Sequence, residues 1–238
     1  AAGEVNFLTA SHFIPAADIE LKRQAAAFSK EKGIKVTIEP IGLMGYAAKL
    51  ASQAHAKLGH DIVGLGPSDP KLYKDLLSDV SDLAEELGKA HGGWHEFARD
   101  VGMEDGRWTA IPYHYIPWPL VVRSDLLKDV GEDKIDTYDD LLRIGRKLKA
   151  KGHPVGFALS HCVDALVNCN CFLYAFGGRG VAEDSKTVVI DSAETARALE
   201  YVKKLYEEAM EPEVFSWDET SNNRFILSGK GSITMNPV

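Results

Sequence analysis

The first seventy residues alternate between two spacings of apolar positions. The run at 5–9 is rich in β-prone residues and 34–38 alternates apolar and polar side chains, which predicts strands, whereas 17–28 and 43–58 place apolar residues three and four apart, which predicts helices. A third apolar run at 61–67 enters a glycine-proline turn. The order strand, helix, strand, helix, strand predicts a mainly parallel sheet with right-handed crossovers.

The second half shows the same two patterns with weaker strands. Residues 79–101 predict short helices, in which Trp94 and Phe97 are expected in the core because they lie three residues apart. A further helix is predicted from Ser192, with Leu199 and Tyr206 on its apolar side. A capping-box-like start opens the helix at 137–148, and short strands are predicted at 155–159, 187–190 and 231–238.

A segment rich in aromatic residues and proline, 105–124, separates the two halves. The residue before each proline is biased toward extended geometry, and proline has no N–H to donate to a sheet. We therefore predict an extended crossing strand whose Tyr and Trp side chains offer flat apolar faces with polar tips. These features suit the floor of a ligand cleft, or equally core aromatics beside a proline-rich connector.

Polar side chains follow the first and third predicted strands, in the loops 10–13 and 64–69. In parallel sheets, ligands bind beyond the carboxyl ends of the strands, so Ser11, His12, Ser68 and Asp69 are candidate contacts. Ser68 or Asp69 could instead cap the helix that begins near Pro70.

Composition limits the classes of function. With 238 residues, 45% hydrophobic and 26% charged, the chain can bury a real core. A formal charge of −8 and short Lys/Arg pairs only argue against nucleic-acid binding. The longest apolar runs fall far short of a membrane span, so an integral membrane protein is not expected.

Three cysteines, Cys162, Cys169 and Cys171, fall in one predicted helix. Their spacing along a helix does not suit disulfides, so buried free thiols are expected. A metal site made from His161, Cys162 and Cys169 is an alternative, although it lacks the paired spacing of zinc signatures.

Five short stretches follow one another along the chain, at 61–65, 105–113, 120–127, 137–142 and 225–235. In this order they resemble the family 1 extracellular solute-binding proteins, the maltose-binding-like receptors of ABC importers. Each stretch is weakly specific, but the ordered set covers essentially the whole chain.

The resemblance implies an α/β fold of the periplasmic-binding-protein type II kind, with two lobes of mixed, mainly parallel sheets and a ligand cleft between them. The expected lobes are 1–113 and 121–238, joined by a hinge or crossing segment at 114–120. Family members are much longer, so an amino-terminal portion or an unusually short relative is expected. Such a protein is a monomeric periplasmic or extracytoplasmic receptor, its signal peptide removed, that passes a sugar or oligosaccharide to a membrane permease without a cofactor.

Hinge closure around the solute is the mechanism that the resemblance implies. Aromatic rings would pack on the C–H face of a sugar, and carboxylate, amide and hydroxyl groups would bind its hydroxyls. The ligand-binding residues expected on this basis are Ser11, His12, Tyr46, Tyr113, His114, Tyr115, Trp118, His161, Asp164 and Trp217, with Tyr46 and Trp217 also suited to a core role.

Three other functions are alternatives to a sugar receptor: an enzyme, a metal-binding receptor and an anion receptor. No phosphate loop, Gly-x-Ser-x-Gly or His-Glu-x-x-His motif supports an enzyme. A metal-binding receptor would use Tyr113 and Tyr115, which share a face if they lie in a strand. A receptor for an anion such as a phosphorylated polyol would use a cationic partner from His12, His114, His161 or Arg179.

Overall fold

The chain passes from one packed unit to a second between Tyr115 and Ile116. The structure is a computed structural model that describes residues 3–12, 14–184 and 186–237. Phe13, at the end of the first predicted loop, and Val238, at the end of the last predicted strand, lie outside the described residues. The two units are Ala1–Tyr115 and Ile116–Val238.

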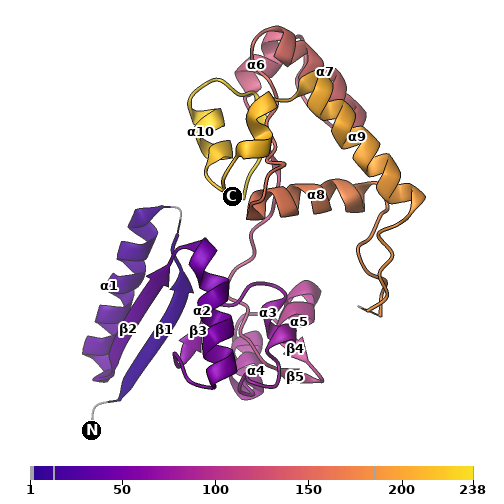
Figure 1. Ribbon diagram of the computed structural model, residues 1–238. Coiled ribbons are helices and arrows are strands. Elements are labelled where there is room, and N and C mark those ends of the chain that lie inside the picture. The colour runs from indigo at the N-terminus through magenta and orange to yellow at the C-terminus, as the bar shows by residue number, and fades with distance from the viewer. Residues whose placement is uncertain (1–2, 13, 185, 238) are drawn as a thin grey trace. The chain divides into compact units, whose positions relative to one another are not determined.

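Unit 1 is built on a parallel sheet of three strands, β1 (Glu4–Ala10), β2 (Lys35–Ile41) and β3 (Ile62–Val63), in the order β2-β1-β3. Helix α1 (Pro15–Lys32) joins β1 to β2, and α2 (Leu43–Ala56) joins β2 to β3 (Figure 1). The predicted strand and helix order is confirmed. The carboxyl ends of β1 and β3 are neighbours because the two strands pair in parallel.

Local chemistry explains the ends of α1. Pro15 occupies the first turn, where its missing N–H costs nothing. Gly33 ends the helix in a left-handed conformation with φ of 68°, and its N–H donates to the Ser29 carbonyl. The buried core beside the sheet is small and consists of Leu8, Tyr46 and Leu50.

The remainder of unit 1 contains short helices and one hairpin. The helices are α3 (Asp69–Leu72), α4 (Ser81–Ala90) and α5 (Glu96–Gly102), and β4 (Met103–Glu104) pairs antiparallel with β5 (Arg107–Trp108). The Trp94 and Trp108 rings lie 5.3 Å apart, and Trp108 is fully buried. Phe97, by contrast, is 44% exposed, so its predicted core position is wrong. Its exposed ring stacks on His95 and packs at a tilt of 45° against Tyr115.

The segment 109–119 contains neither helix nor strand, which corrects the predicted crossing strand. Pairing resumes only at β6 (Leu120–Val122). The physical reason is that Pro112, Pro117 and Pro119 supply no N–H groups, so a ladder cannot continue through them.

In unit 2, β6 pairs antiparallel with β7 (Ile233–Met235). Val155 bridges in parallel to Ile233 on one side and to Met210 on the other. The helices, seen in Figure 1, are α6 (Ser124–Asp129), α7 (Tyr138–Ala150), α8 (Val163–Ala175), α9 (Ala193–Ala209), the 3-10 helix η1 (Pro212–Ser216) and α10 (Ser221–Leu227).

A single large core holds unit 2 together. Ile144 of α7, Leu205 of α9, Phe157 and Phe172 are all essentially inaccessible to solvent. The predicted capping box at the start of α7 is confirmed, with the Thr137 hydroxyl accepting from the Asp140 N–H at 3.0 Å.

Helix α9 faces this core differently from the prediction. Ser192 caps it as expected, and its hydroxyl accepts from the Thr195 N–H at 3.2 Å. The buried side is Ala198, Tyr201 and Leu205, while Leu199 is 65% exposed. Small Ala198 and large Tyr201 fit beside α7 and α8, so packing selected a stripe one position away from the most apolar residues.

Two strands predicted in unit 2 are reduced to single bridges. In 155–159 only Val155 pairs as a strand residue, and in 187–190 only Val188 pairs, with Val181. The prediction of buried thiols also fails at Cys169, which is exposed on α8, whereas Cys162 and Cys171 are half-buried. All three thiols are free in the described structure.

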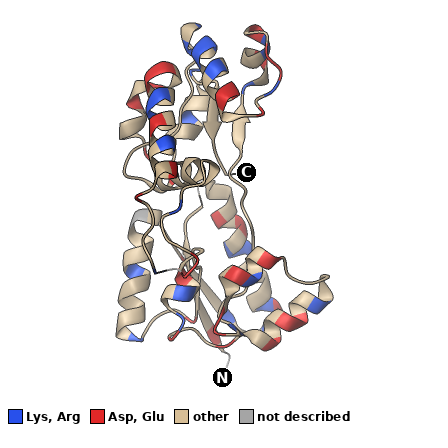
Figure 2. Cartoon of the chain, turned by 90° about the vertical axis from the view of Figure 1, so that its right-hand side faces the viewer, with Lys and Arg blue, Asp and Glu red and all other residues tan. Residues whose placement is uncertain are grey.

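Charges of both signs are interspersed along the helices of each unit (Figure 2). None of the helices in the described residues combines the length and apolar character needed to cross a membrane.

Candidate functional site

In unit 1, the candidate polar groups gather where β1 and β3 end. The Ser11 N–H donates to the Ile41 carbonyl at 2.8 Å, which ties the loop after β1 to the end of β2. His12 is exposed, and its N–H donates to the Asp18 carboxylate at 3.2 Å. After β3, the Asp69 carboxylate accepts from the Gly66 N–H at 2.7 Å, which shapes the second loop.

Ser68 stands at the N-cap position of α3 but makes no capping hydrogen bond, so the expected cap role is not seen there. Ser11 and His12 thus lie at the same sheet edge as the loop that contains Asp69. This edge is the position at which parallel sheets bind ligands.

Tyr46 lies inside unit 1, where it is only 9% exposed. Its hydroxyl donates to the Gly64 carbonyl at the end of β3. Burial, with a smaller contribution from Asp69, raises the pKa of Tyr46 to about 12, so the hydroxyl keeps its proton at neutral pH. Tyr46 therefore fixes the loop after β3 from within the core of unit 1. This position fits its predicted core role and also places it beside the candidate contacts.

The aromatic residues before the unit boundary are open to solvent. Tyr113 and Tyr115 are 78% and 67% exposed. The Tyr113 ring meets His114 edge-on at 4.2 Å, and the Tyr115 ring lies 4.7 Å from Phe97. Exposed aromatic faces that are held by neighbouring rings are available to pack against a ligand.

In unit 2, polar side chains from separate elements meet around Asn222. Its Nδ2 donates to Asp164 Oδ2 at 2.7 Å, to Asn236 Oδ1 at 2.8 Å and to the Met235 carbonyl at 3.2 Å. Asn236 Nδ2 in turn donates to Asn223 Oδ1 at 2.7 Å. The first turns of α8 and α10 and the end of β7 therefore converge on one polar cluster.

Asp164 is the buried acid of this cluster, with 4% of its surface exposed. Burial, with smaller contributions from the nearby Glu219 and Asp218 carboxylates, raises the pKa of Asp164 to about 6. At neutral pH the group is ionised, and the Asn222 amide stabilises that charge.

Trp118 and His161 are the other candidates in this unit. The Trp118 Nε1–H donates to Asn168 Oδ1 at 3.0 Å, and Asn168 Nδ2 donates to the Ala158 carbonyl at 3.2 Å. The end of the proline-rich segment is thereby fixed to α8, the helix that also contains Asp164. His161 is exposed just before that helix.

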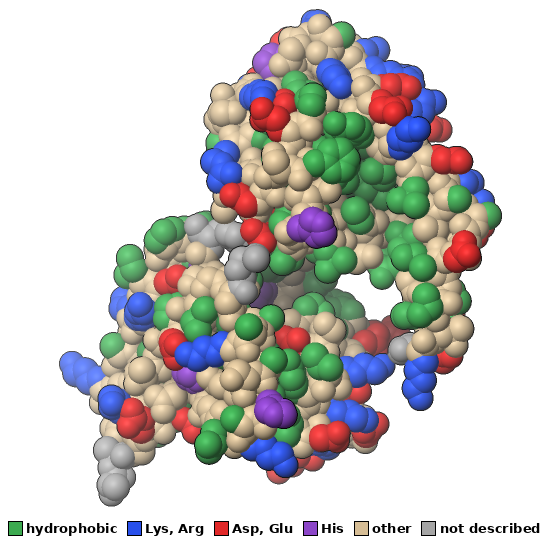
Figure 3. All heavy atoms as spheres, in the orientation of Figure 1, with side chains coloured by type: hydrophobic (Ala, Val, Ile, Leu, Met, Phe, Trp, Pro, Cys, Tyr) green, Lys and Arg blue, Asp and Glu red, His purple; other side chains and the backbone are tan. Residues whose placement is uncertain are grey.

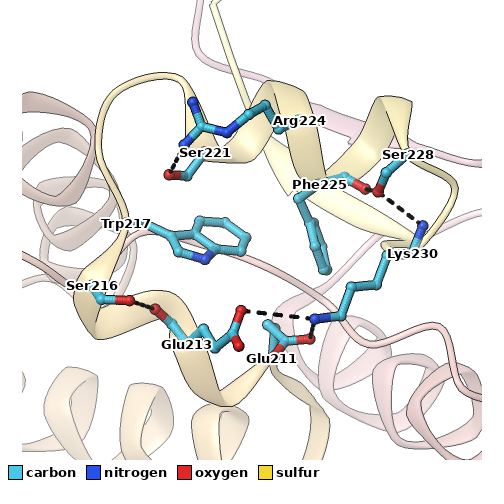
Figure 4. A pocket seen from close by; sticks show the side chains of 9 residues that line it. All are labelled: Glu211, Glu213, Ser216, Trp217, Ser221, Arg224, Phe225, Ser228 and Lys230. Atoms are coloured by element: carbon cyan, nitrogen blue, oxygen red, sulfur yellow. Dashed lines mark hydrogen bonds and ion pairs between the residues drawn. The ribbon is translucent and has the colours of Figure 1, made fainter.

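Trp217 lies apart from the Asp164 cluster as a wall of a pocket between η1 and α10. It is 8% exposed, and its ring centroid lies 5.0 Å from that of Phe225. Figure 4 shows the two rings between Arg224 on one side and the Lys230–Glu211 pair on the other, with 3.0 Å between Lys230 Nζ and Glu211 Oε2. The pocket has a volume of about 390 Å³. Both the predicted site role and the predicted apolar packing of Trp217 are compatible with this position.

The asparagines of the cluster, Asn222, Asn223 and Asn236, were not predicted from the sequence. The available signal was an Asn-Asn pair in the first turn of a helix and an asparagine directly after the last strand. Asn is common at such positions for local reasons alone, so this signal does not distinguish a ligand contact from a turn.

Metal and anion chemistry have less support from side-chain placement. Within the described residues, no group of three His, Cys, Asp or Glu side chains is arranged to hold a metal ion. Tyr113 and Tyr115 contact different neighbours, His114 and Phe97. Arg179 is exposed. Apolar side chains reach the surface of both units between charged ones (Figure 3).

Solved structures with the same fold cover nearly all of the chain. The maltose-bound MalE3 of T. maritima is 22% identical, with a TM-score of 0.81 over 99% of this chain and 61% of its own. A sugar transporter protein of Arthrobacter chlorophenolicus A6 with bound laminaribiose is 20% identical, with a TM-score of 0.82 over 98% and 61%. The GacH receptor of Streptomyces glaucescens is 21% identical, with a TM-score of 0.82 over 100% and 61%.

These similarities confirm the predicted fold class, and the chain spans about three fifths of the length of each of these structures. No curated protein matches the sequence significantly. The profile of the family described as "Bacterial extracellular solute-binding protein" matches residues 23–236. The match confirms the resemblance found in the sequence, and the chain belongs to the bacterial extracellular solute-binding proteins.

Proposed function

We propose that the protein is the extracytoplasmic receptor of an ABC importer and binds a small polyhydroxylated solute, a sugar or oligosaccharide, by hinge closure of two lobes. The observation that carries this proposal is the family match over residues 23–236. The proposed lobes are 1–113 and 121–238, with 114–120 as the hinge. The proposal places the receptor in the periplasm or at the outer face of the membrane, as a monomer that delivers the solute to a membrane permease.

Several solved relatives support the substrate class. They were solved with maltose, laminaribiose, ribitol and D-mannitol, all of which present several hydroxyl groups. A site for such ligands combines flat aromatic faces with hydrogen-bonding groups of both kinds.

The two units of this chain each offer groups of these kinds. Unit 1 presents the exposed rings of Tyr113 and Tyr115 and the loop of Ser11 and His12. Unit 2 presents the acid and amides of the Asp164 cluster. The proposed contacts are Ser11, His12, Tyr113, His114, Tyr115, Trp118, His161, Asp164 and Trp217, with Tyr46 supporting them from the core.

A thermal-shift screen tests the proposal. A solute that binds only the folded chain raises its melting temperature in proportion to ln(1 + [L]/Kd). We expect a shift with at least one of maltose, laminaribiose, ribitol and D-mannitol, followed by saturable binding in calorimetry. Hinge closure predicts that the same solute reduces the radius of gyration in solution scattering.

The rival functions are outcomes of the same experiment. A folded chain that shifts with none of these solutes contradicts the proposal. Stoichiometric iron or zinc in the purified protein would indicate a metal-binding receptor instead of a sugar receptor. Chemical conversion of the bound solute by the purified chain would show an enzyme instead of a receptor.

A further inference from the structure

Four side chains of unit 2 form a continuous relay of hydrogen bonds, Asp164, Asn222, Asn236 and Asn223. The donor-acceptor distances along the relay are 2.7, 2.8 and 2.7 Å. Asn222 is held at both ends of its amide, because its Oδ1 also accepts from the Asn223 N–H at 2.7 Å. Asp164 and Asn222 are more than nine-tenths buried.

The direction of every amide in the relay is fixed by the neighbours of Asn222, which are Asp164, the Met235 carbonyl and the Asn223 N–H. An ionised carboxylate can only accept hydrogen bonds, so Asn222 must present its NH₂ group to Asp164. The same NH₂ group faces Oδ1 of Asn236, which leaves the Asn236 NH₂ group to donate to Oδ1 of Asn223. The NH₂ group of Asn223 is then left at the end of the relay.

Two polar groups at the ends of this relay have no partner among the described residues, Asp164 Oδ1 and Asn223 Nδ2. Among the described residues, the only side-chain N or O atom that is both inaccessible to solvent and without a hydrogen-bond partner is His153 Nδ1. Oδ1 of Asp164 is therefore accessible to solvent, although only 4% of the residue's surface is exposed. The relay thus ends in one free acceptor and one free donor.

Hydroxyl groups suit both ends, because a hydroxyl can donate to a free acceptor or accept from a free donor, whereas a phosphate dianion only accepts. The electrostatics point the same way. Asp218 and Glu219 lie close enough to Asp164 to disfavour its charge. Only Asp218 has an ion-pair partner among the described residues, the exposed Arg224 at 3.0 Å. An anionic group placed at Asp164 would meet like charge.

We propose that Asp164 and Asn223 form a hydroxyl-reading subsite, in which Asp164 accepts from and Asn223 donates to hydroxyl groups of an uncharged polyol or sugar, and in which Asp164 rejects anionic solutes. This inference rests on the proposed receptor function and names its substrate class. It assigns Asn222 and Asn236 as positioning residues that set which atoms the subsite presents.

The test compares neutral polyols with their phosphate esters. Calorimetry measures the dissociation constants of ribitol, D-mannitol and maltose beside ribitol 5-phosphate, mannitol 1-phosphate and maltose 1-phosphate. The wild-type chain should prefer a neutral compound over its phosphate. Asp164→Asn removes the charge and, with its oxygen facing the Asn222 NH₂ group, puts a donor where the free acceptor stood, so affinity for the neutral compound should fall about tenfold to a hundredfold. The ratio between the dissociation constants of the phosphate ester and the neutral compound should decrease as well.

Asn223→Asp exchanges the free donor for an acceptor of the same size, and it should weaken neutral binding to a similar degree. Asp139→Asn and Asn170→Asp are matched controls, because these side chains lie on α7 and α8 and make no side-chain hydrogen bond in the described structure. Both controls should bind within about twofold of wild type. Circular dichroism establishes that each variant is folded, and half-exposed Asn223 keeps the test available if Asp164→Asn does not fold.

The possible results separate the two proposals. A wild-type chain that prefers a phosphate ester overturns the hydroxyl-reading subsite and leaves the receptor function standing. Neutral binding that survives both Asp164→Asn and Asn223→Asp unchanged also overturns the subsite. A folded chain that binds none of the six compounds overturns the proposed function and this inference together.

Discussion

Adding a single methyl group at Gly156 should strongly destabilise unit 2. An ideal Cβ on Gly156 would lie 2.3 Å from Trp217 Cη2 and 2.5 Å from Phe225 Cε1. Favourable carbon contacts lie at about 3.5 to 4.0 Å, so the two rings would have to move by more than an ångström. Both rings are buried, with 8% of Trp217 and 6% of Phe225 exposed.

The size of the effect depends on whether the rings can retreat. Phe225 is also close to Gly231, where an ideal Cβ would lie 2.1 Å from the same Cε1 atom. The ring edge therefore occupies space that exists only because both positions are glycine. Because the ring is confined on both sides, we expect the Gly156→Ala variant to lose about 3 kcal/mol, the upper part of the range for overpacked cores.

Urea unfolding followed by tryptophan fluorescence measures this loss. Gly180→Ala is the matched control, since no atom lies within 4 Å of an ideal Cβ there and its φ is not positive. The control should change the free energy of unfolding by less than about 1 kcal/mol. If Gly156→Ala unfolds within 0.5 kcal/mol of the control, a difference near the error of about 10 to 15% in extrapolated values, the confinement of Phe225 is refuted.

Three smaller predictions concern single side chains. Thr137→Ala removes the capping box of α7 and should cost about 1 kcal/mol in urea unfolding, with no loss expected for a serine, which retains the cap. Tyr46→Phe removes the hydroxyl bond to the Gly64 carbonyl and should cost about 1 kcal/mol, an unchanged midpoint being the contrary result. Asp164 has a pKa of about 6 in the folded chain against an ordinary 3.8, so the folded chain holds the extra proton between these values and its stability falls as pH rises through that window. The difference in unfolding free energy between wild type and Asp164→Asn should therefore shift by about 2 to 3 kcal/mol from pH 3.8 to above pH 6, and a flat difference would show that burial does not perturb this carboxyl.

The relation between sequence and core explains which residue assignments held. Ser192 and Thr137 cap helices through bonds to residues three positions on, so their roles can be predicted from local sequence. Phe97 and Leu199 were assigned from the same kind of spacing, but each can only be buried by partners far along the chain. Spacing identifies a face of a helix and does not show what covers it.

The candidate site shows the same difference between features that local sequence predicts and contacts between residues far apart along the chain. The sequence selected Asp164 through a family resemblance, and the exposed Tyr113 and Tyr115 through an aromatic segment with prolines. It did not reveal that Asp164 contacts Asn222, because 58 residues separate them along the chain. The direction of the amide relay follows from that contact and from those of Asn222 with the Met235 carbonyl and the Asn223 N–H.

By itself, the sequence determined the order of strands and helices in unit 1, the helix caps and the family of the chain, because periodicity, capping and ordered motifs are local properties. Tertiary structure alone decided that Trp217 faces Phe225 beside two glycines, that 109–119 forms no strand, and that three asparagines join Asp164 in one hydrogen-bonded cluster. These outcomes depend on which surfaces, far apart along the chain, pack together and become buried away from water. No local sequence pattern determines which surfaces those are.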